Sequence, residues 1–592
     1  MELTRPIVIG NVAGAMEDCP HAIRHRMVSE GSLDAITGDW LSELNIAWNA
    51  IRKLDDPTKG YEVGFLEQLD DCIEIIADKK IKLVTNAGAL NTVQCAKMVK
   101  EICEKHGLGH LKIAYVEGDD ISDIVIDKAK QQELGGIRHL DKPETTLQSW
   151  GKQPLCGVAY FGGWGIVEAL RHDADLVICG RVTDASPVIA LAAWWHNWSH
   201  DDWDRIAGAL VAGHLIECGP YVTGSNFTGV RSHLDGLVDL GFPIAEIAHD
   251  GTTIITKQPG SAGFVNEFNV RAQFLYELQG QHYINPDVTA DISNVAILNT
   301  SRKDRVRISG AVGSPPPSNT KAIVVSVGGY QAEATFYMNG LDLDAKERFM
   351  RQQIGYAFKD SNFTEISIER YGANIADPSS QALGTVSVRV LVKAKAKEDI
   401  REDYFRKKIY ALRMQLYAGY HMSLDFRTMS PRMFMELFTG LISYEKLAHR
   451  VVIGDEVIQV KHHGITGASL GKRPSAETAN PTALADFGFT NRVPLGAVAH
   501  ARSGDKGDNC NVGFFVRSAE EYRWLQSYLT VPKIIELLGN DYRMHFRFMD
   551  FLGGGAASST RIDMLGKGVA EYLRSKHVDV PAKFLTNPIS LY

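Results

Sequence analysis

The sequence predicts an α/β protein with an N-terminal doubly wound, mostly parallel sheet, a β-rich middle region and a C-terminal α+β domain. In the first half, apolar β-branched runs end in turns with glycine or asparagine, and helical patterns usually follow. From about residue 220, glycine and short β-like runs predominate. A small, polar stretch with two prolines then separates a last unit. We expect an α/β domain with its β-rich middle at 1–464, a linker at 465–488 and an α+β domain at 489–592.

The runs PIVIGN, IKLVTN, LKIAYVEG, GVAYFGG and ADLVICG are expected to form the strands of the N-terminal sheet. Ligands of such sheets bind beyond the carboxyl ends of the strands, where helix N-termini present free N–H groups. This sequence places polar side chains at those points. Asn11, Asn86, Asn91 and Arg181 are therefore predicted to bind substrate, and Asp184 to take part in catalysis.

The middle region is expected to contain a hairpin that turns at Asp250-Gly251, because Asp-Gly favours tight turns between strands. Farther along, the patterns at 345–358 and 402–420 predict amphipathic helices, and the alternation at 382–397 predicts a strand between them. The chain shows no repeat of the solenoid kind.

Composition indicates a globular protein that acts on small molecules. Of the 592 residues, 45% are hydrophobic and 23% are charged, as in soluble proteins. The net charge of −8 and the absence of basic blocks argue against nucleic acid or membrane partners. Eight cysteines without a C-x-x-C pair suit a reducing compartment, and the first apolar run is too short for a signal or a membrane span. We expect a cytoplasmic homo-oligomer with a small-molecule substrate.

The segment GRVTDAS, residues 180–186, has two interpretations. Arg181 binds a substrate carboxylate or phosphate through its planar fork at a helix N-terminus. Alternatively, Arg181 pairs with a protein carboxylate while Asp184 or Ser186 caps the helix.

The segment HLIEC places His214, Glu217 and Cys218 on one face of a helix. A buried helix with a paired glutamate is one interpretation, and a zinc site is another. In the functional interpretation that we prefer to zinc, Glu217 is a general acid or base and Thr223 in the next loop binds substrate. We assign no metal ligands.

Signatures of common nucleotide cofactors are missing. G-x-G-x-x-G and the phosphate-binding P-loop do not occur, so the sequence carries no NAD or P-loop nucleotide signature and leaves the cofactor unknown. Cys179 ends an apolar run, which favours a core thiol over a nucleophile.

The segment RSGDKGDN, residues 502–509, holds more charge than a turn requires. Glycines 504 and 507 suggest a loop with positive φ whose N–H groups form an anion-binding nest. We expect Asp505 to act in proton transfer and Arg502, Lys506 and Asp508 to bind substrate; a self-satisfied ion-pair loop is the alternative. The glycine-rich segment 551–563 is expected to face this loop.

Six segments together resemble the AtuA-like acyclic terpene utilisation family: GNVAGAMEDCPHAI, TNAGALN, GRVTDAS, GHLIECGPYVTG, GFPIAEIAHDGTTIITKQPG and HARSGDKGDN. The resemblance covers residues 5 to about 590. It implies a ferredoxin-like C-terminal domain and a link to bacterial breakdown of terpenes through CoA thioesters of branched acids. Two departures put the substrate in question, since Glu17 precedes Asp18 where the family has glycine, and Pro220 and Tyr221 follow the GHLIECG segment.

We therefore expect a lyase, hydratase or isomerase that acts on a branched or hydroxylated carboxylic acid or its acyl-CoA thioester. Glu217 with Asp184 or Asp505 would supply acid and base, and Arg181, Lys506 and backbone amides would hold the anion. An ester or lactone hydrolase and a non-catalytic ligand-binding protein are the alternatives.

Overall fold

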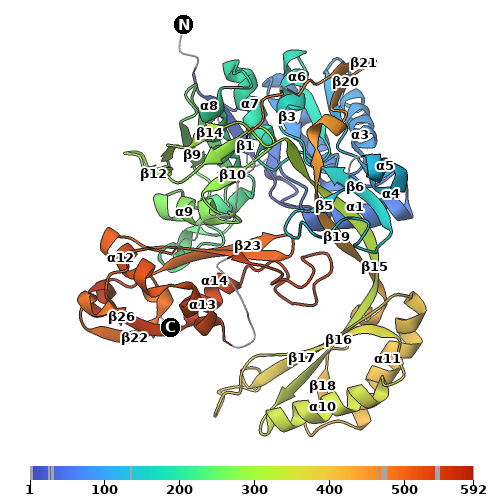
Figure 1. Cartoon of the computed structure of the whole chain (residues 1–592), viewed down its shortest axis with the longest axis vertical. Helices are drawn as coiled ribbons and strands as arrows, with labels where there is room; N and C mark the ends of the chain where they lie inside the picture. The colour runs from blue at the N-terminus through green and yellow to red at the C-terminus, as the bar shows by residue number, and fades with distance from the viewer. Residues whose placement is uncertain are drawn as a thin grey trace. The chain divides into compact units, whose positions relative to one another are not determined.

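The computed structural model describes residues 5–23, 27, 32–133, 136–462, 464–467, 477–539 and 547–590. The chain forms two compact units (Figure 1). Unit 1 comprises Met1–Val325, Leu437–Ala556 and Asp563–Tyr592, and unit 2 comprises Ser326–Glu436 and Ala557–Ile562. Within the expected linker, residues 468–476 lie outside the described residues. The domain boundaries drawn from the sequence remain predictions.

Unit 1 is built on an eleven-stranded mixed sheet in the order β12-β13-β9-β8-β1-β2-β3-β7-β4-β20-β21. Its centre is parallel, as expected, and consists of β1 (Ile7–Asn11), β2 (Ala35–Gly38), β3 (Lys82–Thr85), β7 (Leu176–Cys179) and β4 (Ile113–Glu117). Antiparallel strands flank this centre: β8 (Pro243–Ile247), β9 (Thr253–Lys257), β13 (Val306–Ser309) and β12 (Ala296–Asn299) beside β1, and β20 (Arg450–Ile453) and β21 (Glu456–Gln459) beside β4.

The expectation of a mostly parallel sheet is therefore wrong outside the five central strands. The physical reason is the predicted hairpin at Asp250-Gly251, which the structure confirms. Gly251 has a φ of +83°, and β9 returns antiparallel beside β8. The β-rich middle thus extends the first sheet, because a hairpin adds neighbouring antiparallel strands without a crossover helix.

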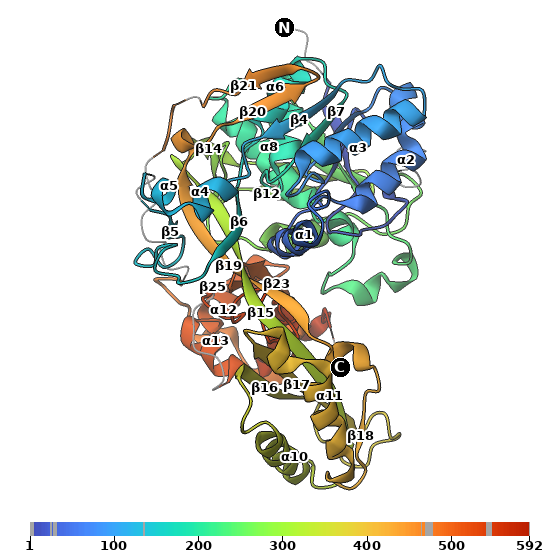
Figure 2. The ribbon, with the colours of Figure 1, turned by 90° about the vertical axis from the view of Figure 1, so that its right-hand side faces the viewer.

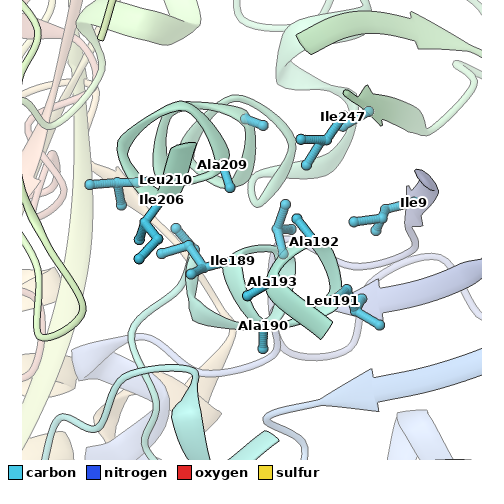
Figure 3. Packing of buried hydrophobic residues seen from close by; sticks show 14 of the residues in the cluster. Ile9, Ile189, Ala190, Leu191, Ala192, Ala193, Ile206, Ala209, Leu210 and Ile247 are labelled. Atoms are coloured by element: carbon cyan, nitrogen blue, oxygen red, sulfur yellow. The ribbon is translucent and has the colours of Figure 1, made fainter. Parts of the chain in front are cut away.

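Helices cover both faces of the sheet, as the alternation of strand and helix predicts. In β7, Val177 and Cys179 join the core under α6 (Trp164–Arg171), α7 (Ser186–His196) and α8 (Trp203–Ile216). Leu176 and Ile178 point to the other face, where α2 (Val63–Asp78) and α3 (Thr92–Lys105) lie side by side (Figure 2). Figure 3 shows aliphatic side chains of α7 and α8 packed together with those of β1 and β8. Such burial on both faces explains the near-continuous apolar runs of these strands.

Two strands differ from the expectation. The run GVAYFGG forms β6 (Pro154–Ala159), which pairs with β15 (Asn319–Asn339) in a second sheet and not with the parallel strands. Conversely, the short run AITG forms β2 in the centre of the large sheet. Four residues are too few for their pattern to identify a strand.

Unit 2 has its own core. Its described part contains β16 (Phe363–Tyr371), β17 (Thr385–Ala394), α10 (Leu343–Ala357) and α11 (Glu402–Ala411), so the strand and both helices expected there are confirmed, the second helix being shorter than predicted. Side chains of α10 and α11 pack on alternating residues of β15 and β17. Among them, Phe405 of α11 is fully buried.

The C-terminal segment of unit 1 forms two small antiparallel sheets and three helices. β22 (Thr490–Pro494) pairs with β26 (His577–Pro581), and β23 (His500–Lys506) pairs with β24 (Asn509–Phe515) and β25 (Arg547–Phe548). The helices are α12 (Ala519–Tyr528), α13 (Val531–Leu538) and α14 (Val569–Ser575). Figure 1 shows this group in orange and red. No helix within the described residues has the length and apolar character of a membrane span.

Candidate functional site

Charged side chains from four elements meet beyond the carboxyl ends of the parallel strands. We call Asp39, Arg181, Asp184, Glu217 and Lys506 the strand-end cluster. Asp39 follows β2, Arg181 lies two residues after β7, and Asp184 lies in the loop that leads to α7. Glu217 ends α8, and Lys506 is the last residue of β23. Parallel strands bring their carboxyl ends to one edge of the sheet, and this sets the first three residues side by side.

Arg181 is the buried positive charge of the cluster, with 2% of its surface exposed. Its Nη1 donates to the carbonyl oxygen of Leu41 at 2.6 Å, and its Nη2 pairs with Asp184 Oδ1 at 2.9 Å. The guanidinium lies 4.0 Å from the ring centroid of Tyr160. Burial acts to lower the pKa of Arg181, but Asp184, Tyr160 and other acidic groups hold it above its usual value. Both η nitrogens are therefore occupied by the protein, and only Nε is buried without a hydrogen-bond partner in the described part of the chain.

Asp39 is a buried carboxyl group whose pKa the surrounding structure raises. Burial, followed by the charges of Asp184 and Glu217, raises the pKa of Asp39 well above its usual value. Asn86 Nδ2 donates to Asp39 Oδ1 at 2.5 Å, and Asn86 Oδ1 accepts the Trp40 N–H at 2.8 Å. Asn86, expected to bind substrate, thus orients Asp39.

Glu217 lies beside His214, with 3.6 Å between Oε1 and Nδ1, and both residues are buried. Burial raises the pKa of Glu217 to about 7 against the opposing effect of His214, and the charge of Asp184 makes a smaller contribution in the same direction as burial. Asn11 Nδ2 donates to the carbonyl oxygens of Ile216 at 2.6 Å and Glu217 at 3.1 Å. Asn11, expected to bind substrate, thus fixes the end of α8. A carboxyl group with a pKa near 7 can give or take a proton at neutral pH.

A second charged pair borders the cluster. Lys321 Nζ of β15 lies 2.5 Å from Glu43 Oε1, at the first residue of α1 (Glu43–Asp55). Burial acts to raise the pKa of Glu43, but the charges of Lys321, Lys506 and Arg181 hold it well below its usual value. The Tyr160 hydroxyl lies 3.4 Å from the same carboxylate oxygen. Glu43 is therefore an ionised group whose pKa is shifted in the direction opposite to that of Asp39.

The C-terminal hairpin brings Lys506 and Asp505 to this edge. Lys506 Nζ lies 2.5 Å from Glu277 Oε2, and the side chain of Lys506 is 30% exposed. Burial acts to lower the pKa of Lys506, but the charges of Glu277, Asp184 and Glu43 raise it well above its usual value. Burial and the charges of Glu277 and Glu43 raise the pKa of Asp505 to about 7. Residues of the two ends of the sequence thus share one electrostatic environment.

The segment RSGDKGDN is not a loop, and the expected anion-binding nest is wrong. Residues 502–506 continue β23, so their backbone groups pair with β24, and only Gly507 and Asp508 form the turn. Gly507 has the predicted positive φ, +63°, whereas Gly504 has none. Gly504 lies so close to Tyr276 that a Cβ at this position would be 2.2 Å from the Tyr276 ring. In regular strand pairing, the N–H groups that a nest requires donate hydrogen bonds to the neighbouring strand.

Four other residues that we expected to bind substrate contact groups of the protein: Arg502, Thr223, Asn91 and Asp508. The Arg502 guanidinium lies over the rings of Tyr221 and Tyr276, 4.5 and 4.3 Å from their centroids. Thr223 is fully buried and donates its hydroxyl to the Gly241 carbonyl at 2.6 Å. Their positions support structural roles.

Asn91 Nδ2 donates to the backbone carbonyls of Pro57 and Lys59, so it ties a loop to the start of α3. Asp508 Oδ1 accepts the Gly554 N–H at 2.7 Å. The glycine-rich turn therefore contacts the hairpin, as the sequence predicts, through its glycines.

The thiols are unsuited to nucleophilic attack. Burial raises the pKa of Cys179 and of Cys218 well above the usual value, with a further contribution from Asp119 to the first and Glu217 to the second. Thiols of this kind stay protonated at neutral pH. No group of three or more His, Cys, Asp or Glu side chains within the described ranges is arranged to hold a metal ion, so the HLIEC segment gains no support as a zinc site.

Sequence reasoning missed Asp39, Glu43, Tyr160, Glu277 and Lys321. The signal for Asp39 is present, since AITG-Asp39 repeats the pattern of an apolar run that ends in glycine and a polar residue. Glu43 and Lys321 have no local signal, because they are 278 residues apart and only the tertiary structure pairs them. Glu277 adopts a φ of +61° and receives Lys506 from the C-terminal hairpin, and neither property has a pattern in the chain.

Comparison with known families agrees with the motifs. A family model described as acyclic terpene utilisation family protein AtuA matches residues 7–453, and one described as AtuA ferredoxin-like domain matches residues 493–542. No curated protein and no solved structure matches the chain. The first model covers more than half of the sequence and includes Asp39, Arg181, Asp184 and Glu217, while the second includes Lys506. The chain belongs to the acyclic terpene utilisation family AtuA and carries the family's ferredoxin-like domain at its C-terminal end.

Proposed function

We propose that the strand-end cluster is the active site of an enzyme that moves protons on a small carboxylic acid or its acyl-CoA thioester, as a lyase, hydratase or isomerase. One observation carries the proposal. Two carboxyl groups, Asp39 and Glu217, have raised pKa values. The charge of Asp184, which pairs with Arg181, contributes to both shifts. Pairs of carboxyl groups in different protonation states are how proteins supply an acid and a base at one pH.

The roles follow from the surroundings of each group. Asp184, which pairs with Arg181, takes a proton from the carbon next to the substrate carbonyl, and the electron pair forms a double bond. Glu217, with a pKa of about 7, gives its proton to the departing hydroxyl, which leaves as water. Addition of water is the reverse, and an isomerase returns the proton to another carbon. Protons and electrons balance in each case without a redox partner.

The positive charges hold the substrate anion. Lys506 is the partly exposed cation of the cluster, whereas Arg181 is buried and engaged by Leu41 and Asp184. Lys506 is therefore the direct contact to a carboxylate or phosphate, and Arg181 stabilises negative charge that develops on the substrate. A ligand anion would have to compete with Glu277 for Lys506.

Two other functions remain as alternatives. An ester or lactone hydrolase would need an activated water, since the thiols near the cluster stay protonated. A non-catalytic binding protein would use the same cations and leave the carboxyl groups without a chemical role. The binding alternative leaves the raised pKa of Glu217 without a function.

The test is isotope exchange. Purified protein is incubated in D2O with branched and hydroxylated acids and their CoA thioesters, and mass spectrometry records deuterium on carbon, loss or gain of water, and free thiol. We expect deuterium uptake or a change in water content that Glu217→Gln lowers at least about 100-fold. Lys506→Met should mainly raise KM. The control is Lys533→Met, which removes a lysine with a comparable ion pair to Glu536 on α13.

Each outcome decides between the candidates. Release of free thiol or alcohol without deuterium on carbon would identify a hydrolase. Saturable binding with no isotope uptake would identify a binding protein. Exchange that persists unchanged in Glu217→Gln would remove Glu217 from the mechanism.

A further inference from the structure

Unit 1 contains a cavity that no side chain of the strand-end cluster lines. Its volume is about 180 Å³. A cavity of about 150 Å³ is large enough to hold benzene. Its lining includes aromatic and imidazole rings: Phe161, Trp164, Tyr444, His200, His449 and His462.

The rings that line the cavity are paired, each aromatic ring with one histidine. Phe161 stacks on His449 with 4.3 Å between ring centroids and 5° between planes. Trp164 lies on His200 at 3.5 Å. In the third pair, the centroids of Tyr444 and His462 are 5.2 Å apart. Two of these pairs are stacked, whereas the planes of Trp164 and His200 are tilted by 33°. Flat rings around one space favour a flat occupant, because offset stacking requires extended planar surfaces.

The cavity is unsuited to a charged occupant. Burial lowers the pKa of His449 to about 4, with a contribution from His462, and burial also lowers the pKa of His462, so these two imidazoles are neutral at pH 7. Asp287 contributes the buried charge, and its carboxylate accepts the Gly163 N–H at 2.8 Å, at the start of α6. That contact already occupies the helix N-terminus. Glu445 and Lys461, which carry opposite charges, also line the cavity, and both are exposed.

Two buried ring nitrogens of the lining residues are unused. Trp164 Nε1 and His449 Nε2 have no hydrogen-bond partner in the described part of the chain. Trp164 is 9% exposed, and its indole can only donate. A buried donor without an acceptor costs free energy, so an occupant that supplies an acceptor gains affinity.

We propose that this cavity binds a compact, uncharged, planar ring compound with at least one hydrogen-bond acceptor, such as a two-ring nitrogen heterocycle. The site is separate from the strand-end cluster, since none of that cluster's side chains lines it. It is nevertheless joined to the cluster through the backbone: the Phe161 N–H donates to the Arg181 carbonyl at 3.0 Å, and the Thr183 N–H donates to the Phe161 carbonyl at 2.9 Å. The proposal does not depend on the reaction proposed above.

The test compares quinoline with naphthalene on the full chain at pH 7.5, where both are neutral and only quinoline carries an acceptor. Calorimetry and saturation-transfer NMR measure their dissociation constants, with benzoate and benzylamine as anionic and cationic probes of similar size. We expect quinoline to bind at least about 5-fold more tightly than naphthalene, which is the effect of one hydrogen bond. Benzoate and benzylamine should bind more weakly than either.

Trp164→Phe keeps a ring and removes the donor, so it should weaken quinoline binding about 5-fold and leave naphthalene unchanged. Trp48→Phe, at a tryptophan with 45% exposure, should change neither. Leu447→Phe adds volume to the lining and should weaken both ligands, which provides a second variant if Trp164→Phe fails to fold. Absence of quinoline binding, equal binding of quinoline and naphthalene, or a preference for benzoate or benzylamine would overturn the proposal.

Discussion

At the scale of single residues, Arg181 is a buried charge that several protein groups contact at once. Its two η nitrogens serve the Leu41 carbonyl and Asp184, and its plane lies over Tyr160. A guanidinium offers five donors in a rigid fork, whereas an ammonium is a point charge.

Arg181→Lys should therefore destabilise unit 1 even though the charge is kept. A lysine cannot serve both partners in the same geometry, and one buried acceptor left unpaired costs about 1–3 kcal/mol. The measurement is the urea midpoint of unfolding, with Arg205→Lys as the control because its pair with Asp202 is 37% exposed on the arginine side. Equal midpoints for the wild type and Arg181→Lys would show that the fork geometry contributes nothing.

Glu217 should make the stability of the protein depend on pH. Its pKa is about 7 in the folded chain and near 4.5 when unfolded, so the folded state binds the proton more tightly between these values. The stabilisation is complete below about pH 4.5 and is lost as pH rises through 7, by up to about 3 kcal/mol. Glu217→Gln cannot ionise, and its melting temperature relative to wild type should rise from pH 5 to pH 8.

The comparison variant for this pH series is Glu536→Gln, at a glutamate whose side chain is 67% exposed and whose partner Lys533 does not titrate between pH 5 and pH 8. A difference between Glu217→Gln and wild type that stays constant from pH 5 to pH 8 would contradict the raised pKa.

At the scale of elements, the hairpin of β23 and β24 depends on two glycines for different reasons. Gly507 needs its positive φ for the turn, and the nearest atom to a Cβ there is 3.8 Å away. Gly504 needs space, because a Cβ would lie 2.2 Å from the Tyr276 ring. Tyr276 also holds Lys567 Nζ at 2.9 Å, so a shift of its ring disturbs further contacts.

Gly504→Ala should thus be more damaging than Gly507→Ala. An alanine with positive φ costs about 1 kcal/mol. A clash in a packed core typically costs 1–3 kcal/mol, by forcing side chains out of place. Thermal melting of both variants, with Gly355→Ala on α10 as a control at a glycine with open space, measures the difference. A larger loss for Gly507→Ala would mean that Tyr276 moves aside without cost.

At the scale of the whole molecule, the chain has two compact units with separate cores. The core of unit 2 is formed by β15, β17, α10 and α11, and it includes Phe405 at 0% exposure. Proteins with several units need not unfold in one step, because each core supplies its own cooperativity.

Phe405→Ala should therefore weaken unit 2 alone, by about 3–5 kcal/mol, the usual cost of truncating a buried phenylalanine. Hydrogen exchange followed by mass spectrometry should show faster exchange in β16 and β17, while α7 and α8 exchange at wild-type rates. The matched change in unit 1 is Phe65→Ala on α2, which should leave β16 and β17 unaffected. Faster exchange throughout the chain in Phe405→Ala would show that the two cores unfold together.

The local sequence determined those features that depend on neighbouring residues. Periodicity identified α10, α11 and the strands β1, β3, β4 and β7, because the order of apolar and polar residues within each element follows its pattern of burial. It also placed Arg181 and Asp184 after the end of a strand and Glu217 on a helix, and predicted the positive φ of Gly507. The sequence pattern did not identify β2, since four residues carry little pattern. It also assigned β6 to the wrong sheet, since the alternation of a strand does not specify which strand pairs with it.

Only the tertiary structure decided which distant groups meet. Asp39 acquires a raised pKa because α8 and the loop before α7 bring Glu217 and Asp184 beside it. Lys506 reaches Glu277 across more than 200 positions of the chain, and strand pairing converts the expected nest into a hairpin. The physical reason is that charge–charge coupling and burial depend on distance in space, whereas a sequence pattern reports only the neighbours of each residue.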